Sequence, residues 1–322
     1  MIAALLALFV VGDVVTGPSA LLPTPAPAPV VLVPGPVVAG PIKNGDLVLV
    51  GAGDIASCGN DDDERTAVLV ERVLAKSDKA WAFTLGDNVY PDGTIDEFFR
   101  CYEPTWGRFK ARTLPVVGNH DWRTANAAGF RSTFARRFAA DSPLWYSVDV
   151  EGRGSDGLPA RWHVVVLDSD CDKVDCGAGS PQHSWLQADL KKHAATKCTL
   201  ALFHHPRFSS GPHGDAEPMV PLWSVLDQGG VDLVLAGHDH TYERFPALGS
   251  KGDVVVGAGI TSMVVGTGGK SHYPIVVPRA HSIVRDAGAF GVLQLQLHSE
   301  GWNSRFLSVS GAEADVVDGR CR

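Results

Sequence analysis

The sequence predicts an α/β fold, in which buried strands alternate with helices along the chain. Short apolar runs recur between residues 47 and 236, and two of the segments that connect them carry apolar residues at helical spacing. Five of the runs end in a turn that contains glycine or histidine and that carries Asp, Asn or His. Ligands of open α/β sheets bind outside the carboxyl ends of the strands, so these five turns predict one shared site.

The expected elements follow one another in a simple order. Helices are expected at 61–76, with Val68, Leu69, Val73 and Leu74 on the apolar face, and at 181–195. After about residue 240 the pattern becomes β-rich, with strands expected near 262–265 and 289–297 and no helix. Strands in the first part are expected at 47–50, 81–85, 114–117, 162–167, 199–203 and 231–236.

Composition excludes several classes of protein. The 322 residues are 45% hydrophobic and 20% charged, which excludes disorder throughout the chain. The net charge of −8 does not suit nucleic-acid binding through a basic surface, and no such binding is expected. No apolar run reaches the 18 or so residues of a membrane span. The length allows two domains, and one large α/β domain fits equally well.

The N-terminal segment reads as a signal peptide at residues 1–20. Residues 2–12 are almost wholly apolar, and the small residues that follow offer a cleavage site after Ala20. The usual basic start is missing, because no Lys or Arg precedes Lys43; a buried strand or helix is the alternative. The proline-rich stretch at 21–46 reads as an extended linker, and the catalytic domain is expected at 47–322. The expected location is therefore periplasmic or extracellular.

The six cysteines favour disulfides in an exported protein. Six cysteines allow 15 pairings, and the sequence leaves most of them open. Cys171 and Cys176 flank a short polar stretch and are expected to close a small loop. Six reduced thiols remain the alternative. A structural zinc site is not expected, because the sequence has no CxxC pair.

The five strand-end turns carry a set of metal-ligand residues. Carboxylates, amide oxygens, phenols and imidazoles at the ends of neighbouring strands are the ligand types of a two-metal hydrolytic site. Such a site would attract a phosphate dianion and supply hydroxide near neutral pH. The seven candidate metal ligands are Asp54, Asp87, Tyr90, Asn119, His204, His238 and His240.

Asp87 is the expected bridge between the two metals. With Asp54, Tyr90 and His240 it forms a set of three anionic oxygens and one imidazole, which suits a trivalent ion such as ferric iron. The other set shares Asp87 and adds Asn119, His204 and His238. This second set suits zinc, manganese or ferrous iron.

The turns, taken in order, resemble the five signature blocks of calcineurin-like metallophosphoesterases. Tyr90, three residues after Asp87, and the absence of a histidine at Ala56 make the chain similar to the small purple acid phosphatases. That resemblance implies a four-layer α/β/β/α sandwich with two metals at one edge, a ferric ion at Tyr90, and hydrolysis of phosphomonoesters by a metal-bound hydroxide. It spans about residues 47–269. The blocks are Gly53-Asp54, Gly86-Asp87-Asn88-Val89-Tyr90, Gly118-Asn119-His120-Asp121, Phe203-His204-His205-Pro206 and Gly237-His238-Asp239-His240.

Three further residues are expected to act on the substrate, a small phosphate ester. The resemblance implies that His120 contacts the phosphate and protonates the leaving alcohol, and Asp121 is expected to orient the His120 ring. His213, nine residues after His204, is similar to a family histidine near the phosphate. His205 matches no ligand role and is expected either to support the ligands from behind or to have a structural role.

Two other functions remain open at this point. A phosphodiesterase or nucleotidase would use the same metal ligands and differ only in its substrate pocket. A non-catalytic binding protein on a degenerate version of the fold is the more remote alternative, because such proteins usually lose the site residues first. A serine hydrolase has little support, since the chain has no GxSxG motif.

Overall fold

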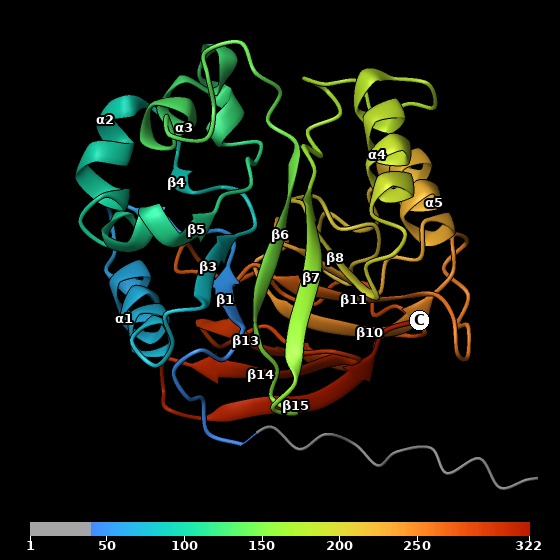
Figure 1. The fold of residues 1–322 in the computed structure, drawn as a ribbon. Coiled ribbons are helices and arrows are strands. Elements are labelled where there is room, and N and C mark those ends of the chain that lie inside the picture. Colours follow the sequence, from blue (N-terminus) through green and yellow to red (C-terminus); the bar gives the residue numbers. More distant parts are fainter. Residues whose placement is uncertain (1–39) are drawn as a thin grey trace, which may run out of the picture. The chain divides into compact units, whose positions relative to one another are not determined.

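Two β-sheets pack face to face in residues 40–322, the part of the chain that the computed structural model describes (Figure 1). The expected signal peptide and the linker up to residue 39 lie outside the described residues. The last linker residues join the fold, because Asp46 accepts a hydrogen bond from the backbone N–H of Lys43 (2.7 Å) and pairs with Arg153 (2.6 Å).

The first sheet has six strands in the order β15-β14-β13-β1-β3-β5. Strands β1, β3 and β5 are parallel, and β13, β14 and β15 are added as an antiparallel meander. The bounds are β1 Val48–Ala52, β3 Ala80–Thr84, β5 Thr113–Leu114, β13 Gly291–His298, β14 Gly301–Ser308 and β15 Glu313–Arg320.

The second sheet has seven strands in the order β12-β10-β11-β9-β8-β7-β6. Strands β7, β8, β9 and β11 are parallel, and the other three pair antiparallel at the two edges. The bounds are β6 Tyr146–Arg153, β7 Pro159–Val166, β8 Cys198–Leu202, β9 Leu233–Ala236, β10 Tyr242–Leu248, β11 Ile260–Val265 and β12 Val284–Asp286. A short parallel pair, β2 Ala56–Ser57 and β4 Val89–Tyr90, stands apart from both sheets.

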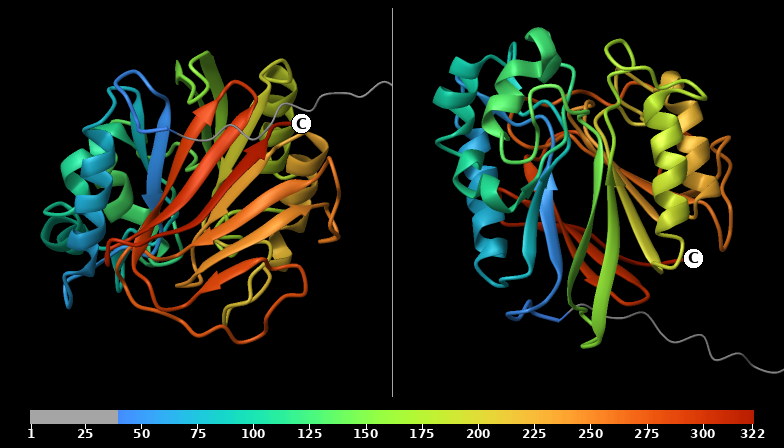
Figure 2. Two further views of the ribbon diagram at one scale, coloured as in Figure 1. Left: turned by 90° about the horizontal axis from the view of Figure 1, so that it is seen from below. Right: turned by 45° about the horizontal axis from the view of Figure 1, so that its top comes forward.

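Helices cover the outer faces of both sheets and complete four layers (Figure 2). Helices α1, α2 and α3 flank the first sheet, and α4 and α5 flank the second (Figure 1). The bounds are α1 Asp62–Leu74, α2 Ile95–Glu97, α3 Ala128–Thr133, α4 Pro181–Lys192 and α5 Val220–Gln228, with short helical turns at Phe98–Tyr102, Trp106–Arg112, Asp121–Arg123, Ala125–Ala127 and Glu217–Met219.

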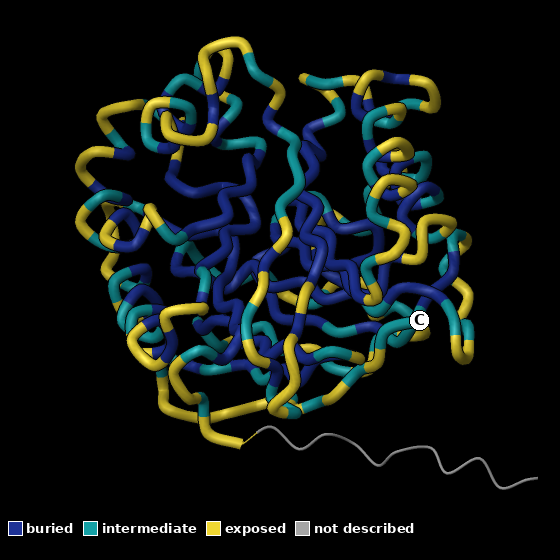
Figure 3. The backbone as a smooth tube through the Cα atoms, viewed as in Figure 1, coloured by how far each residue is buried: buried dark blue, intermediate teal, exposed yellow. Residues whose placement is uncertain are grey.

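Alternation along the central strands builds two apolar cores. Val164 and Val166 of β7 join the core between the sheets, whereas Val165 joins the core beneath α4 and α5. Successive side chains of a strand point to opposite faces, so one buried strand serves both layers. Figure 3 shows the central strands, such as β1, β8 and β9, as buried, whereas the edge strands β6 and β15 are partly exposed.

The predicted fold class and four-layer architecture are confirmed, with one strand shorter than expected. The strand predicted at 114–117 ends at Leu114, because Pro115 has no N–H to continue the ladder, and Val116 N donates to the Thr84 hydroxyl instead (3.0 Å). The elements that were not predicted are helices α2, α3 and α5 and strands β2, β4, β6, β10, β12, β14 and β15. In the described residues no helix follows Gln228, as expected.

Three disulfides join all six cysteines, all of which lie in the described residues. The expected Cys171–Cys176 loop is confirmed, with Cα atoms 5.4 Å apart. Cys58 pairs with Cys101 and Cys198 with Cys321, the last bridge tying the C-terminus to β8. Among the described residues no helix is long and apolar enough to cross a bilayer.

Candidate metal centre

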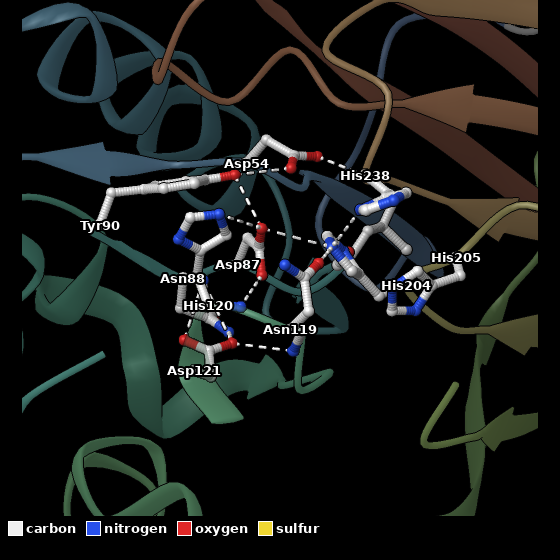
Figure 4. A network of polar contacts seen from close by, with 12 residues as sticks. Asp54, Asp87, Asn88, Tyr90, Asn119, His120, Asp121, His204, His205 and His238 are labelled. Carbon is white, nitrogen blue, oxygen red and sulfur yellow. Dashed lines mark hydrogen bonds and ion pairs between the residues drawn. The ribbon is translucent and has the colours of Figure 1, made fainter. Parts of the chain in front are cut away.

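The candidate ligands meet at one edge of the two sheets, just beyond the carboxyl ends of four parallel strands. Asp54 follows β1, Asp87 follows β3, His204 follows β8, and His238 follows β9. Asn119 reaches the same place from the loop after β5. Figure 4 shows these side chains directed toward one another from separate strands, as the sequence predicts.

Backbone strain concentrates at the same turns. Asp54, Asp87 and His238 have φ angles of 61°, 48° and 70°, in the left-handed region that residues other than glycine rarely adopt. Gly118 lies so close to Asp87 that a Cβ atom would overlap the Asp87 carboxylate. Conformations of this kind persist where the surrounding fold holds them, and they cluster at functional sites.

The Tyr90 hydroxyl stands between two carboxylates. It lies 2.8 Å from Asp54 Oδ1, 2.9 Å from Asp87 Oδ2 and 3.1 Å from His240 Nε2. One hydroxyl carries one proton, so it cannot donate to both carboxylates at once. Burial and the charges of Asp54 and Asp87 raise the pKa of Tyr90 well above its usual range. Only a strong local positive charge would convert this phenol to a phenolate.

The imidazole of His204 is the centre of the second set. Its Nδ1 lies 2.7 Å from the Leu85 carbonyl oxygen, which leaves Nε2 directed at Asn119 Oδ1 (3.0 Å) and Asp87 Oδ2 (3.4 Å). Its Nε2 also lies 3.3 Å from His238 Nδ1. Burial alone would lower the pKa of His204, but Asp87 raises it to about 10. The raised pKa means that positive charge is favoured beside Asp87 Oδ2, where His204 Nε2 carries a proton. A metal cation would suit the same position.

Contacts behind the ligands fix their orientation. The Nδ1 of His240 lies 2.8 Å from the Ser271 hydroxyl, and its ring stacks on Tyr273 with centroids 3.9 Å apart. His238 N donates to Asp54 Oδ2 (2.8 Å). Partners of this kind set which ring nitrogen is free to bind a metal. Ser271 and Tyr273 were not predicted, since their loop approaches the centre only in the folded chain and carries no motif.

His120 lies beside the bridge, but Asp121 does not orient it. The His120 backbone N donates to Asp87 Oδ1 (2.8 Å), and the ring Nδ1 lies 2.5 Å from the Pro91 carbonyl oxygen. The Asp121 carboxylate instead accepts from Asn88 Nδ2 (2.8 Å) and from the backbone N of Gly118 (2.9 Å). The expectation for Asp121 is corrected here: the residue begins a 3₁₀ turn, where neighbouring side chains diverge by about 120°.

The burial of Asp121 also raises the pKa of its carboxyl group. Desolvation and the nearby charge of Asp87 raise the pKa of Asp121 to about 7. Its contacts tie the second and third signature blocks together through Asn88 and Gly118. Asp121 therefore positions the loop that carries Asn119 and His120.

The rings of His213 and His205 lie beside that of His238. His213 Nδ1 lies 2.8 Å from Asp239 Oδ1, and the ring is 4.1 Å from that of His238. Hydrogen bonding to Asp239 raises the pKa of His213. His205 is partly buried, and its Nδ1 lies 3.0 Å from the Ser169 hydroxyl, a contact that ties its ring to the loop after β7.

The whole set suits two cations better than it suits protons. Ligand atoms of Asp54, Asp87 and His204 lie within 4.8 Å of one another, and all three residues are buried. Carboxylate, phenol, amide and imidazole groups face a common space, where one phenol proton lies between two carboxylates and one imidazole nitrogen faces two acceptors. Unpaired lone pairs in a buried site are costly, and metal ions are the usual way in which proteins compensate them. The residues therefore fit the expected dinuclear group.

Comparison with known proteins agrees with this geometry. Residues 10–242 match the sequence profile described as calcineurin-like phosphoesterase. Purple acid phosphatase 23 of Arabidopsis thaliana is 32% identical over 174 residues, which cover 48% of this chain and 35% of that protein. This chain thus spans about a third of the length of that relative.

Two solved structures share the fold. Purple acid phosphatase PPD1 from yellow lupin superposes with a TM-score of 0.68 at 19% identity, covering 87% of this chain and 54% of that one. GAP50, described as the anchor in the inner membrane complex of Plasmodium, superposes with a TM-score of 0.65 at 15% identity, covering 86% of this chain and 89% of that one. At these identities the likeness concerns the fold alone.

Proposed function

Because the chain belongs to the calcineurin-like phosphoesterase family, we propose that it is a metal-dependent phosphatase that hydrolyses phosphomonoesters. One observation carries the proposal: the Tyr90 hydroxyl lies within 2.9 Å of the carboxylates of both Asp54 and Asp87. A neutral phenol in that position does not explain the arrangement, since its one proton cannot form hydrogen bonds to both carboxylates. A phenolate of Tyr90 that binds a trivalent ion would explain the arrangement. Such a tyrosine ligand is the feature that resembles purple acid phosphatases.

The metal assignment follows from the two donor sets. Asp54, Tyr90 and His240 would hold ferric iron, with Asp87 shared between the sites. Asn119, His204 and His238 would hold zinc, manganese or ferrous iron. When bound, the two ions supply Lewis-acid activation of water and positive charge against the phosphate.

The protein's own residues supply the proton and the positioning. His120 is half-buried beside Asp87, with its Nε2 3.9 Å from Asp87 Oδ2, where a protonated ring reaches the oxygen of the leaving alcohol. His213, held by Asp239, would donate a hydrogen bond to the phosphate. Asp121 would keep Asn119 and His120 in place through Gly118 and Asn88.

The test compares two esters on metal-loaded protein. We expect turnover of p-nitrophenyl phosphate and much slower turnover of bis(p-nitrophenyl) phosphate. A preference for the diester would replace the proposal with a phosphodiesterase. Loss of both activities in protein that holds two metals would favour a non-catalytic binding protein.

A spectrum tests the iron assignment separately. Wild-type protein loaded with iron is expected to show a visible phenolate-to-iron absorption band. Tyr90→Phe keeps the ring, removes the oxygen, and is expected to abolish the band. Iron-loaded wild-type protein without such a band would refute the purple acid phosphatase assignment, while the other six ligands would still support a metallophosphoesterase.

We also propose that the protein is exported. The three disulfides support this, because such bonds persist mainly in oxidising compartments. N-terminal sequencing of the protein recovered outside the cytoplasm is expected to begin at Leu21. Recovery only from the cytoplasm, with alkylatable thiols, would contradict export.

A further inference from the structure

A pocket of about 250 Å³ opens beside the candidate metal centre. Three imidazoles of the centre and its surroundings, those of His205, His213 and His238, form one wall. The segment 169–172 also lines the pocket. A phosphate held near His213 and His238 would direct its alcohol group into this space, so the pocket is positioned to contact the leaving group.

The acidic wall is held rigidly against the metal ligands. The Ser169 hydroxyl accepts hydrogen bonds from the backbone N–H groups of His204 (3.1 Å) and His205 (2.8 Å). Asp170 N donates to Asp168 Oδ1 (3.1 Å), and the Cys171–Cys176 disulfide closes the loop that follows. Groups fixed in this way lose little conformational entropy when a ligand binds, so they can discriminate between ligands.

The lining carries two carboxylates beside its three imidazoles. Asp170 is only 7% exposed and lines the pocket, and the exposed Asp172 lies beside it. No Lys or Arg belongs to the lining among the described residues. Two cations lie near the lining without belonging to it. Arg279 pairs with Asp215 at 3.0 Å, and Lys173 is exposed and acts on Asp170 by its charge. The remaining wall is apolar, with Pro206, Ala216, Pro218 and Met219.

We propose that this pocket makes the enzyme selective for phosphomonoesters whose alcohol part carries a positive charge, such as phosphorylated short-chain amino alcohols. The inference rests on the proposed function, and it names the substrate class of that same site. An ammonium group attached through a short alkyl chain would pack its carbons on the apolar wall and pair with Asp170. An anionic group beside Asp170 and Asp172 would be disfavoured by repulsion from the two carboxylates.

Three esters of similar size test the selectivity. They are O-phosphoethanolamine, propyl phosphate and 2-phosphoglycolate, which place a cation, a methyl group and a carboxylate at corresponding positions. Each is compared by kcat/KM in wild-type protein and in variants. The ratio of the cationic to the anionic ester is then compared between proteins, because differences in leaving-group reactivity cancel in that comparison.

We expect Asp170→Asn to lower the cation-to-anion ratio about 10- to 100-fold, the size of a charge contact at a buried carboxylate. Asp172→Lys changes an exposed position, folds without repacking, and is expected to lower the ratio about 2- to 5-fold. Asp175→Asn is the matched control. It lies in the same disulfide loop outside the pocket lining, where its Oδ1 accepts the Gly177 N–H (2.8 Å), and the ratio should not change.

The outcomes separate this inference from the proposed function. Wild-type protein that hydrolyses p-nitrophenyl phosphate, but whose ratio is the same in Asp170→Asn and Asp172→Lys, overturns the charge selectivity alone. A ratio that falls equally in Asp175→Asn also overturns it, since the effect would then come from the loop as a whole. Metal-loaded wild-type protein that hydrolyses none of the esters overturns both.

Discussion

Two clusters of carboxylates and imidazoles occur in the described residues, and they behave differently. The candidate metal centre lies at the strand ends, and the second cluster lies between β6, β7 and α4. We call the second one the β6–α4 cluster; its members are Asp149, His163, Asp189 and His193. Both contain groups of three residues that are close enough to bind a metal ion.

In the β6–α4 cluster every acceptor has a donor. His163 is 1% exposed, and its two ring nitrogens lie 2.8 Å from Asp149 Oδ1 and 2.7 Å from Asp189 Oδ2. Arg161 donates to Asp149 (2.6 Å) and Ser147 donates to Asp189 (2.8 Å). A ring that donates from both nitrogens is an imidazolium and has no lone pair left for a metal.

In the candidate metal centre, single hydrogen-bond donors are shared between several acceptors. One phenol proton serves Asp54 and Asp87 together, and the Nε2 of His204 faces both Asn119 and Asp87. The comparison teaches that residue type alone does not define a metal site. The sharing of donors does, because one cation can serve several buried acceptors that must otherwise share a single proton.

The largest expected difference between the clusters concerns metal content. Asp87→Ala removes the group expected to serve both ions, so we expect loss of both metals and of measurable turnover, more than about 100-fold. Asp149→Ala is the matched change in the β6–α4 cluster and should leave metal content unchanged. Elemental analysis of both purified variants measures this. Two retained metal equivalents in Asp87→Ala would remove the bridging role.

The second comparison is between His120, which lies beside the metal centre, and His193 of the β6–α4 cluster. His120→Ala is expected to lower kcat about 10²- to 10⁴-fold while keeping the metals, if its ring protonates the leaving alcohol. The loss should shrink for esters with good leaving groups, because these need no proton. His193→Ala, in the β6–α4 cluster, should leave kcat unchanged. An equal loss for all leaving groups would assign His120 to phosphate positioning instead.

The smallest expected effect is on stability and depends on pH. Burial lowers the pKa of His163, but Asp189 and Asp149 outweigh it, so the net shift is upward from 6.5. A raised pKa contributes stability that is complete below about pH 6.5 and is lost as pH rises through the folded value. The pKa values of Asp149 and Asp189 are lowered from 3.8, so their contribution is lost in acid.

His163→Gln should therefore destabilise the fold by about 1–3 kcal/mol near pH 5.5, and by less near pH 9. Urea unfolding of wild type and variant at the two pH values measures the difference. A destabilisation that grows toward alkaline pH would show that His163 is neutral in the folded protein.

Much of the metal centre was predictable from sequence because its ligands directly follow buried strands. Asp54 and His238 each stand one or two residues beyond an apolar run, so local pattern predicts both the strand and its end. Asp121 was assigned the wrong contact, because adjacency in sequence does not give the direction of a side chain on a tight turn.

The rest depends on contacts between distant segments. Asp149 and His163 face each other only through the register of β6 and β7, and Asp189 reaches them from α4. Ser271 reaches His240 from a loop that carries no motif. Pairings of this kind arise from packing, and no short pattern in the sequence encodes them.

One measurement tests the central claim most directly: anomalous diffraction from crystals of protein produced with iron and zinc, recorded at the absorption edges of both metals. The account predicts two peaks among the seven strand-end ligands, with Asp87 between them and the iron peak next to Tyr90, and no peak at the β6–α4 cluster. A centre without peaks, or a peak between His163 and His193, would contradict it.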